Sequence, residues 1–180
     1  MNKSLSKQTV IFHWLTGILF IAVFVIGLQF EGMPRGPEKG ELMGLHKSLG
    51  LIVLVVALSR FVWRLKEGAI ESVAVLTRAQ EIAAKGVHHF LLLVTLAMPI
   101  SGAVMSVAGG RALELFGIEL IAAGEKTEWL QSAASFVHVN AVNLIMVVFA
   151  LHVLGALKHQ LVDKDGTLSR MLGRSSSVSK

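Results

Sequence analysis

Four long apolar runs constrain the fold of this 180-residue chain more than any other feature. They cover roughly residues 10–30, 42–62, 87–107 and 134–157, and a helix needs about 20 mostly apolar residues to cross a bilayer. Hydrophobic residues make up 53% of the chain, more than a soluble domain of this length carries. The sequence therefore predicts an all-α protein, an integral membrane four-helix bundle surrounded by the lipid bilayer.

The positive charges predict how this bundle is oriented. They gather before the first run, between the second and third runs, and after the fourth run. Because cytoplasmic loops are enriched in Lys and Arg, both termini and the middle connection are expected to be cytoplasmic. Nucleic-acid binding is not expected, since these cations flank apolar runs and are not interleaved with aromatic residues. The cations are Lys3, Lys7, Arg60, Arg64, Lys66, Arg78, Lys85, Lys158, Lys164, Arg170, Arg174 and Lys180.

The segments outside the runs differ in character. The first connection is rich in Gly and Pro, which is typical of a turn between antiparallel helices. The second is predicted to include a short surface helix around residues 71–85. The third is mixed and ends in Thr127 and Glu128, a suitable cap and first turn for a last helix that begins before the bilayer. Residues 1–172 are expected to form one membrane domain, and residues 173–180 a basic, Ser-rich tail.

Four histidines lie near the ends of the apolar runs. His138 and His152 are fourteen residues apart in the fourth run, so on one helix they share a face and are about 21 Å apart along the axis. His13 lies in the first run and His46 in the second. With the orientation above, His13 and His152 are at the cytoplasmic depth, and His46 and His138 at the outer depth. The sequence predicts two level pairs of imidazoles.

Such pairs are suited to haem, because haem iron takes one axial ligand on each face and neutral imidazole is a good ligand. The chain has no cysteine, which excludes thiolate metal sites, iron–sulfur clusters and c-type haem. A closed zinc site needs four ligands, and a proton relay lacks partners because the four runs contain no Asp or Glu. We therefore predict two b-type haems held by His13 with His152 and by His46 with His138. The alternative is that these are hydrogen-bonded packing residues.

Three glycines fit the same interpretation. Gly17 and Gly50 each follow a histidine by about one helical turn, and Gly155 lies close to His152. A flat porphyrin lying against a helix needs gaps of this kind. The alternative is that these glycines allow close packing between membrane helices.

Arg60 is a candidate partner for the haem propionates. It follows His46 by fourteen residues, so it lies on the same helix face at the depth of the inner pair. Arg64 is the second candidate. The alternative is that both arginines mark the cytoplasmic boundary of the helix.

Short motifs run along nearly the whole chain. They are His13-Trp14-Leu15, Leu45-His46 with Gly50, Arg60 to Arg64, His88 through Pro99 and Gly102, His138-Val139-Asn140, Leu151-His152 to His159, and Lys164-Asp165-Gly166-Thr167-Leu168-Ser169-Arg170-Met171. Together they resemble the bacterial cytochrome b561 family of di-haem, quinone-linked membrane cytochromes. The resemblance implies bis-histidine haem b at both sites and a location in the bacterial inner membrane. Its last stretch is particularly similar to members that look like superoxide oxidase.

The resemblance implies an oxidoreductase that takes electrons from superoxide on the outer side and passes them through both haems to ubiquinone. Since both axial positions are filled, substrates cannot bind the iron, and electrons must pass through the porphyrin edge. The outer cations Lys47, Arg35 and Lys39 would attract an anionic donor. The alternative for these three is ordinary solvated loop charge.

The best candidate for the quinone end is His159, two turns beyond His152 at the cytoplasmic interface. There it could hydrogen-bond or protonate a reduced quinone oxygen, unless it is a plain interfacial residue. Lys7 is a weaker candidate, and His88 is expected near a propionate or the quinone.

Two other function classes are considered. The first is a cytochrome b electron-transfer subunit linking a partner dehydrogenase to the quinone pool, and the chain has no long soluble extension for docking such a partner. The second is a transporter, which four spans without an inverted repeat do not favour.

Overall fold

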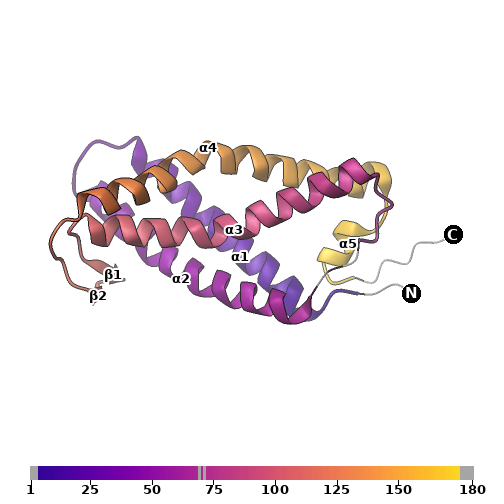
Figure 1. Cartoon of the computed structure of the whole chain (residues 1–180), viewed down its shortest axis with the longest axis horizontal. Helices are drawn as coiled ribbons and strands as arrows, with labels where there is room; N and C mark the ends of the chain where they lie inside the picture. The colour runs from indigo at the N-terminus through magenta and orange to yellow at the C-terminus, as the bar shows by residue number, and fades with distance from the viewer. Residues whose placement is uncertain (1–3, 69, 71, 175–180) are drawn as a thin grey trace.

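The computed structural model describes residues 4–68, 70 and 72–174, and within them four long helices run up and down as a bundle (Figure 1). Each helix is long and apolar enough to cross a membrane, which confirms the four predicted spans and is consistent with a multi-pass membrane protein. The helices are α1 (Lys7–Glu31), α2 (Pro37–Glu67), α3 (Arg78–Ala108) and α4 (Glu128–Lys158).

The helices begin where the sequence supplies caps. The Ser6 side chain accepts a hydrogen bond of 3.1 Å from the Thr9 backbone N–H at the start of α1. Pro37 opens α2, where its missing N–H costs nothing. A reciprocal capping box between Thr77 and Gln80 opens α3. The fourth helix begins at Glu128, as the sequence predicted.

The second connection differs from the prediction of a separate surface helix around residues 71–85. Residues 72–77 are non-helical, and residues 78–85 form the first turns of α3 itself, because the capping box extends that helix well before its apolar run. Residue 71 lies outside the described residues, and so do residues 175–180 of the predicted tail.

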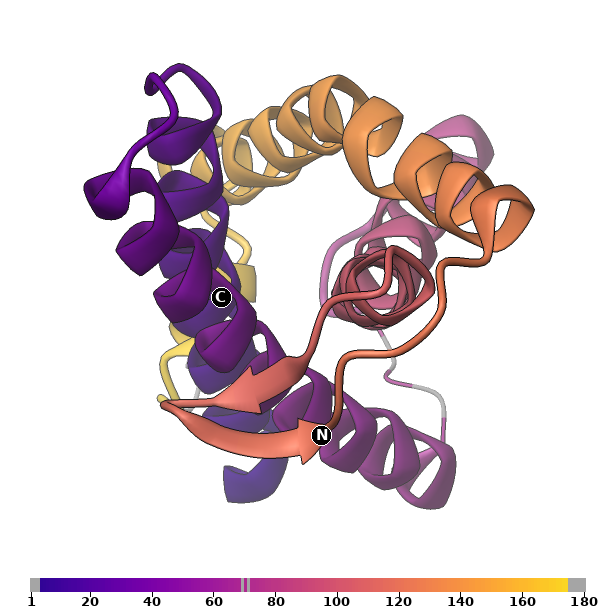
Figure 2. The same cartoon turned by 90° about the vertical axis from the view of Figure 1, so that its left-hand side faces the viewer.

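The third connection contains a β-hairpin that was not predicted. Strand β1 (Leu113–Leu115) pairs antiparallel with β2 (Ile118–Ile121). Phe116 and Gly117 join them with φ values of 49° and 82°, the positive values that a two-residue type I′ turn needs. The hairpin packs against α2, and Figure 2 looks along the bundle with the hairpin in front. We call this the hairpin end of the bundle.

At the opposite end, where α1 begins, the chain that follows α4 folds back toward the other helices (Figure 1). The last long helix continues as a π-helical turn, η1 (His159–Asp163), which leads into the short helix α5 (Thr167–Met171). The Trp14 indole N–H on α1 donates to the Met171 backbone carbonyl over 2.8 Å, which ties α5 to α1. We call this the terminal end.

The middle of the bundle is an apolar layer. Its buried residues are Val94 and Met98 on α3 and Ile145 on α4, with Phe20 and Phe24 of α1 packed against them. Most other large apolar side chains of the helices are exposed, as expected where lipid covers the surface. The buried layer therefore lies between the two levels at which histidines occur.

Candidate functional site

The structure brings the four predicted histidines together in the two pairs expected from their depth. At the hairpin end, the ring centroids of His46 on α2 and His138 on α4 are 6.1 Å apart. At the terminal end, the ring centroids of His13 on α1 and His152 on α4 are also 6.1 Å apart. Each pair therefore joins α4 to a helix from the other half of the bundle.

This spacing fits two imidazoles on one metal ion. A metal–imidazole bond is about 2 Å long, and the ring centroid lies about 1 Å behind the bonding nitrogen, so two axial imidazoles have centroids roughly 6 Å apart. Two pairs at this separation, each supplying two nitrogen donors, fit the axial positions of two haem groups.

The hairpin-end pair is oriented by backbone carbonyls. The Nδ1 atom of His46 lies 3.0 Å from the Val23 carbonyl oxygen on α1. The Nδ1 atom of His138 lies 2.9 Å from the Met98 carbonyl oxygen and 3.1 Å from the Ser101 hydroxyl on α3. A carbonyl oxygen only accepts, so each Nδ1 carries the proton and each Nε2 keeps a lone pair for a metal. Hydrogen bonds of this kind hold metal-binding histidines in place.

Two further glycines lie directly against these rings. A Cβ atom at Gly27 would come within 3.1 Å of His46 Cε1, and one at Gly102 within 2.9 Å of His138 Cε1. Larger residues at either position would therefore push the imidazole away. Gly27 was not predicted, since its closeness to His46 depends on how α1 packs against α2.

The glycines predicted to make room for a porphyrin behave differently. A Cβ atom built at Gly17, Gly50 or Gly155 would have no described atom within 4 Å, apart from its chain neighbours and the nearby backbone of its own helix. Close helix packing is therefore not their role in the described structure. They leave space that a side chain would fill, which fits a flat group lying beside the histidines.

The terminal-end pair has two additional neighbours. The His88 ring centroid lies 5.5 Å from that of His152, and Arg60 Nη2 lies 3.5 Å from His13 Nδ1. Arg60 therefore lies beside the inner pair, at the depth inferred from its spacing to His46. Arg64 instead donates a hydrogen bond to the Gly68 carbonyl, where it caps the end of α2. A guanidinium and a third imidazole therefore surround the terminal-end pair.

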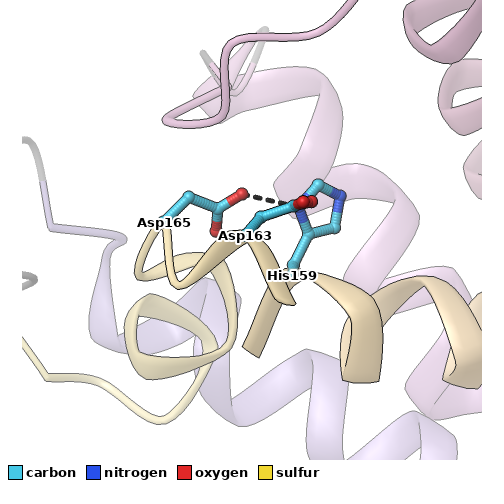
Figure 3. Close-up of side chains that lie close together, drawn as sticks. All are labelled: His159, Asp163 and Asp165. Carbon is cyan, nitrogen blue, oxygen red and sulfur yellow. Dashed lines mark hydrogen bonds and ion pairs between the residues drawn. The ribbon is translucent and has the colours of Figure 1, made fainter. Parts of the chain in front are cut away.

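His159 lies in a cluster with two carboxylates (Figure 3). Its Nδ1 atom is 2.6 Å from Asp165 Oδ2 and 3.2 Å from Asp163 Oδ2. Asp163 also forms an ion pair of 2.5 Å with Lys158. Lys7, the other predicted quinone residue, begins α1 with an exposed side chain. The two carboxylates were not predicted, although the Asp165–Gly166 dipeptide is a turn signal.

The three cations predicted to steer an anion occupy different environments. Arg35 is exposed in the loop between α1 and α2. Lys47 is half-buried, with its Nζ atom 3.5 Å from the Ala112 carbonyl oxygen next to the hairpin. Lys39 donates hydrogen bonds to the Met33 and Glu31 carbonyls at 2.8 and 3.4 Å, so it also stabilises the end of α1.

A four-helix membrane bundle with paired imidazoles at two levels is a framework for binding haem inside a membrane. The chain belongs to the prokaryotic cytochrome b561 family, whose model matches residues 4–174. Family membership implies that the protein binds haem b.

Curated relatives match over almost the full chain. Cytochrome b561 homolog 2 of Escherichia coli (strain K12) is 33% identical over 92% of this chain and 89% of the relative. Cytochrome b561 homolog 1 of the same organism is 27% identical, covering 97% and 99%. A protein of Yersinia pestis named "Probable superoxide oxidase CybB" is 26% identical, covering 96% and 97%.

Proposed function

We propose that this protein is a di-haem b electron-transfer enzyme that oxidises superoxide at the hairpin end and reduces ubiquinone at the terminal end. His46 with His138 would hold one haem, and His13 with His152 the other. The observation that carries this proposal is the equal separation of 6.1 Å in the two histidine pairs. Bound haem b supplies a reversible one-electron carrier at each pair. Residues 1–172 form the functional unit and residues 173–180 its tail.

The histidines also limit the chemistry. With haem bound, the two imidazoles of each pair would hold the iron between them and would leave no position for a substrate to bind the metal. This favours electron transfer over peroxidase or oxygenase activity. The Nδ1 hydrogen bonds of His46 and His138 increase the basicity of the coordinating nitrogens and hold the rings in orientation.

The apolar layer separates the two ends. Ile145 lies seven residues from both His138 and His152, which is about 10 Å along the helix in each direction. With Val94, Met98 and the phenylalanines of α1, it excludes water and ions between the two pairs. Electrons can cross such a layer between carriers, while protons and superoxide cannot.

The charged and polar residues at the two ends suit different molecules. Superoxide is an anion, and the hairpin end offers the ammonium of Lys47 and the exposed guanidinium of Arg35. The name of the Yersinia pestis relative supports superoxide as the donor. At the terminal end, Arg60 is suited to the haem propionates, and His159 or Lys7 to the quinone. The excess of cations makes the terminal end the cytoplasmic side.

The reaction balances with two donors for each quinone. Two superoxide ions lose one electron each and leave as two molecules of oxygen. One ubiquinone takes up the two electrons and two protons from the terminal side to become ubiquinol.

Stopped-flow spectroscopy of the purified protein in detergent tests this function. Superoxide is expected to produce the reduced b-type spectrum, and added ubiquinone to return it to the oxidised form. A matched sample with superoxide dismutase should remain oxidised. If superoxide reduces the haem no faster than this control, while an electron-donating dehydrogenase does, the protein is instead an electron-transfer subunit.

A further inference from the structure

The turn after α4 brings a carboxylate back onto His159. The helix widens into η1, and then Lys164 and Gly166 adopt left-handed conformations with φ values of 52° and 80°. These two residues reverse the chain, so that Asp165 lies against the imidazole six residues before it (Figure 3). A strained non-glycine residue at position 164 indicates that this reversal is maintained by the contacts around it.

Asp165 is held at both carboxylate oxygens. Its Oδ2 atom accepts a hydrogen bond of 2.6 Å from His159 Nδ1, and its Oδ1 atom accepts one of 2.9 Å from the Thr167 backbone N–H. The side chain is 14% exposed. Asp163 is engaged differently, since Lys158 lies 2.5 Å from it and its own distance to Nδ1 is 3.2 Å. Asp165 is therefore the carboxylate that fixes the imidazole.

The arrangement sets which ring nitrogen is available. With Nδ1–H donating to Asp165, the Nε2 atom is on the side of the ring turned away from both carboxylates (Figure 3). Burial raises the pKa of Asp165, but hydrogen bonds from Thr167 and His159 outweigh it and leave that pKa below its ordinary value. Asp165 is thus charged at neutral pH and accepts the Nδ1–H hydrogen bond of His159 as a carboxylate.

We propose that Asp165 is a positioning residue for quinone reduction, which holds His159 so that Nε2 delivers a proton to the reduced quinone oxygen. This inference rests on the proposed function, in which His159 lies at the quinone end. In the transfer, the Nε2–H bond breaks and an O–H bond forms on the quinone, and His159 then regains a proton from water at the terminal side. The electrons come from superoxide, as above.

Other charged groups lie on the turn and on the elements packed against it. Lys158 on α4 is neutralised by Asp163, and α5 carries the buried Arg170. Lys164 lies in the turn itself. Asp163 lies 3.2 Å from His159 Nδ1, against 2.6 Å for Asp165, and its closer partner is Lys158, so its removal should disturb the orientation of His159 less.

The test compares Asp165→Asn with the matched control Asp163→Asn in the holoprotein. Each protein, treated with EDTA, is reduced anaerobically and mixed with ubiquinone-1 across a pH series. We expect Asp165→Asn to slow quinone reduction at least about tenfold, since general acid catalysis contributes about 10²–10⁴-fold. The pH profile of its rate should also differ from that of wild type, because the proton-donating imidazole has lost its carboxylate partner. The rate of quinone reduction by Asp163→Asn should stay within about twofold of the wild-type rate.

Separate measurements distinguish the proposed role of Asp165 from the proposed function of the whole protein. The reduced spectrum and the rate of haem reduction by superoxide, measured without quinone, should be unchanged in Asp165→Asn. If Asp165→Asn alters that spectrum, or slows quinone reduction equally at every pH, Asp165 is merely structural and the inference is overturned. It is also overturned if EDTA abolishes wild-type quinone reduction and Zn²⁺ restores it, since the cluster would then be a metal site. If His159→Gln reduces quinone normally, the proposed quinone end itself is wrong.

Discussion

The Nδ1 atom of His46 lies 3.0 Å from the backbone carbonyl oxygen of Val23 on the neighbouring helix. The partner is a main-chain atom, so the orientation of the imidazole depends on how α1 and α2 are aligned and not on any one side chain. His138 makes the equivalent contact with the Met98 carbonyl on α3. The hairpin-end pair is therefore held by the bundle as a whole, and changes that disturb helix packing should disturb this site first.

Gly102→Ala should weaken haem binding at the hairpin end. The new methyl group would lie 2.9 Å from His138 Cε1, closer than carbon atoms can approach, and the imidazole would have to move. We expect loss of one haem per chain while the terminal-end haem remains, measured by haem content and the reduced spectrum. Gly86→Ala on the same helix meets no described atom within 4 Å and is the control. Two haems in Gly102→Ala would show that His138 does not need its present position.

Gly50→Leu tests whether a porphyrin lies against α2. The leucine would meet no described protein atom at its Cβ, so the protein should still fold and insert in the membrane. If the porphyrin occupies this space, haem content should fall to about one per chain. Gly44→Leu, on the same helix with an equally open surrounding, should keep both haems. Equal haem content in the two variants would mean that Gly50 has no part in haem binding.

Lys47→Gln should slow the reaction with superoxide. Removing one cation from the hairpin end weakens the attraction of an anion, and we expect a severalfold lower bimolecular rate with a weaker dependence on ionic strength. The measurement is stopped-flow haem reduction at several salt concentrations. Lys126→Gln removes a cation that is already paired with Glu128, and it should change the rate less. If Lys126→Gln slowed the reaction with superoxide more than Lys47→Gln did, superoxide would not approach the protein beside Lys47.

The stability of the terminal-end turn should depend on pH through Asp165. Its pKa in the folded chain lies below the ordinary value of 3.8. A carboxyl with a lowered folded pKa stabilises the fold above its unfolded pKa, and this contribution is lost as the pH falls through the folded pKa. Wild type should therefore unfold at a higher temperature than Asp165→Asn near neutral pH, with a difference that shrinks below about pH 4. A difference that is constant down to acid pH would contradict the charged state of Asp165.

Much of the histidine arrangement follows from the sequence because it depends on local rules. The fourteen-residue spacing of His138 and His152 sets their shared face, and the antiparallel order of the runs sets which histidine is level with which. Neither property depends on side-chain packing. The same holds for Arg60, whose position follows from its spacing to His46.

Features that depend on tertiary packing were not predictable in this way. The hairpin has strands of three and four residues, and its turn has Phe116 at a positive φ where glycine or asparagine is the usual signal. The approach of Asp165 to His159 needs the chain reversal at Lys164, and no periodic sequence pattern predicts that reversal. Lys39 could be predicted as a cation, but not as a donor to the end of α1.

Haem content in paired histidine variants tests the central proposal most directly. We predict two haems per chain in wild type. His46→Ala/His138→Ala should bind one haem, and so should His13→Ala/His152→Ala, because each of these double variants removes a single site. His46→Ala/His152→Ala should bind none, because it breaks both sites. His88→Ala should keep two haems, although its ring lies near His152. One haem in wild type, or one haem retained in His46→Ala/His152→Ala, would contradict the proposed pairing.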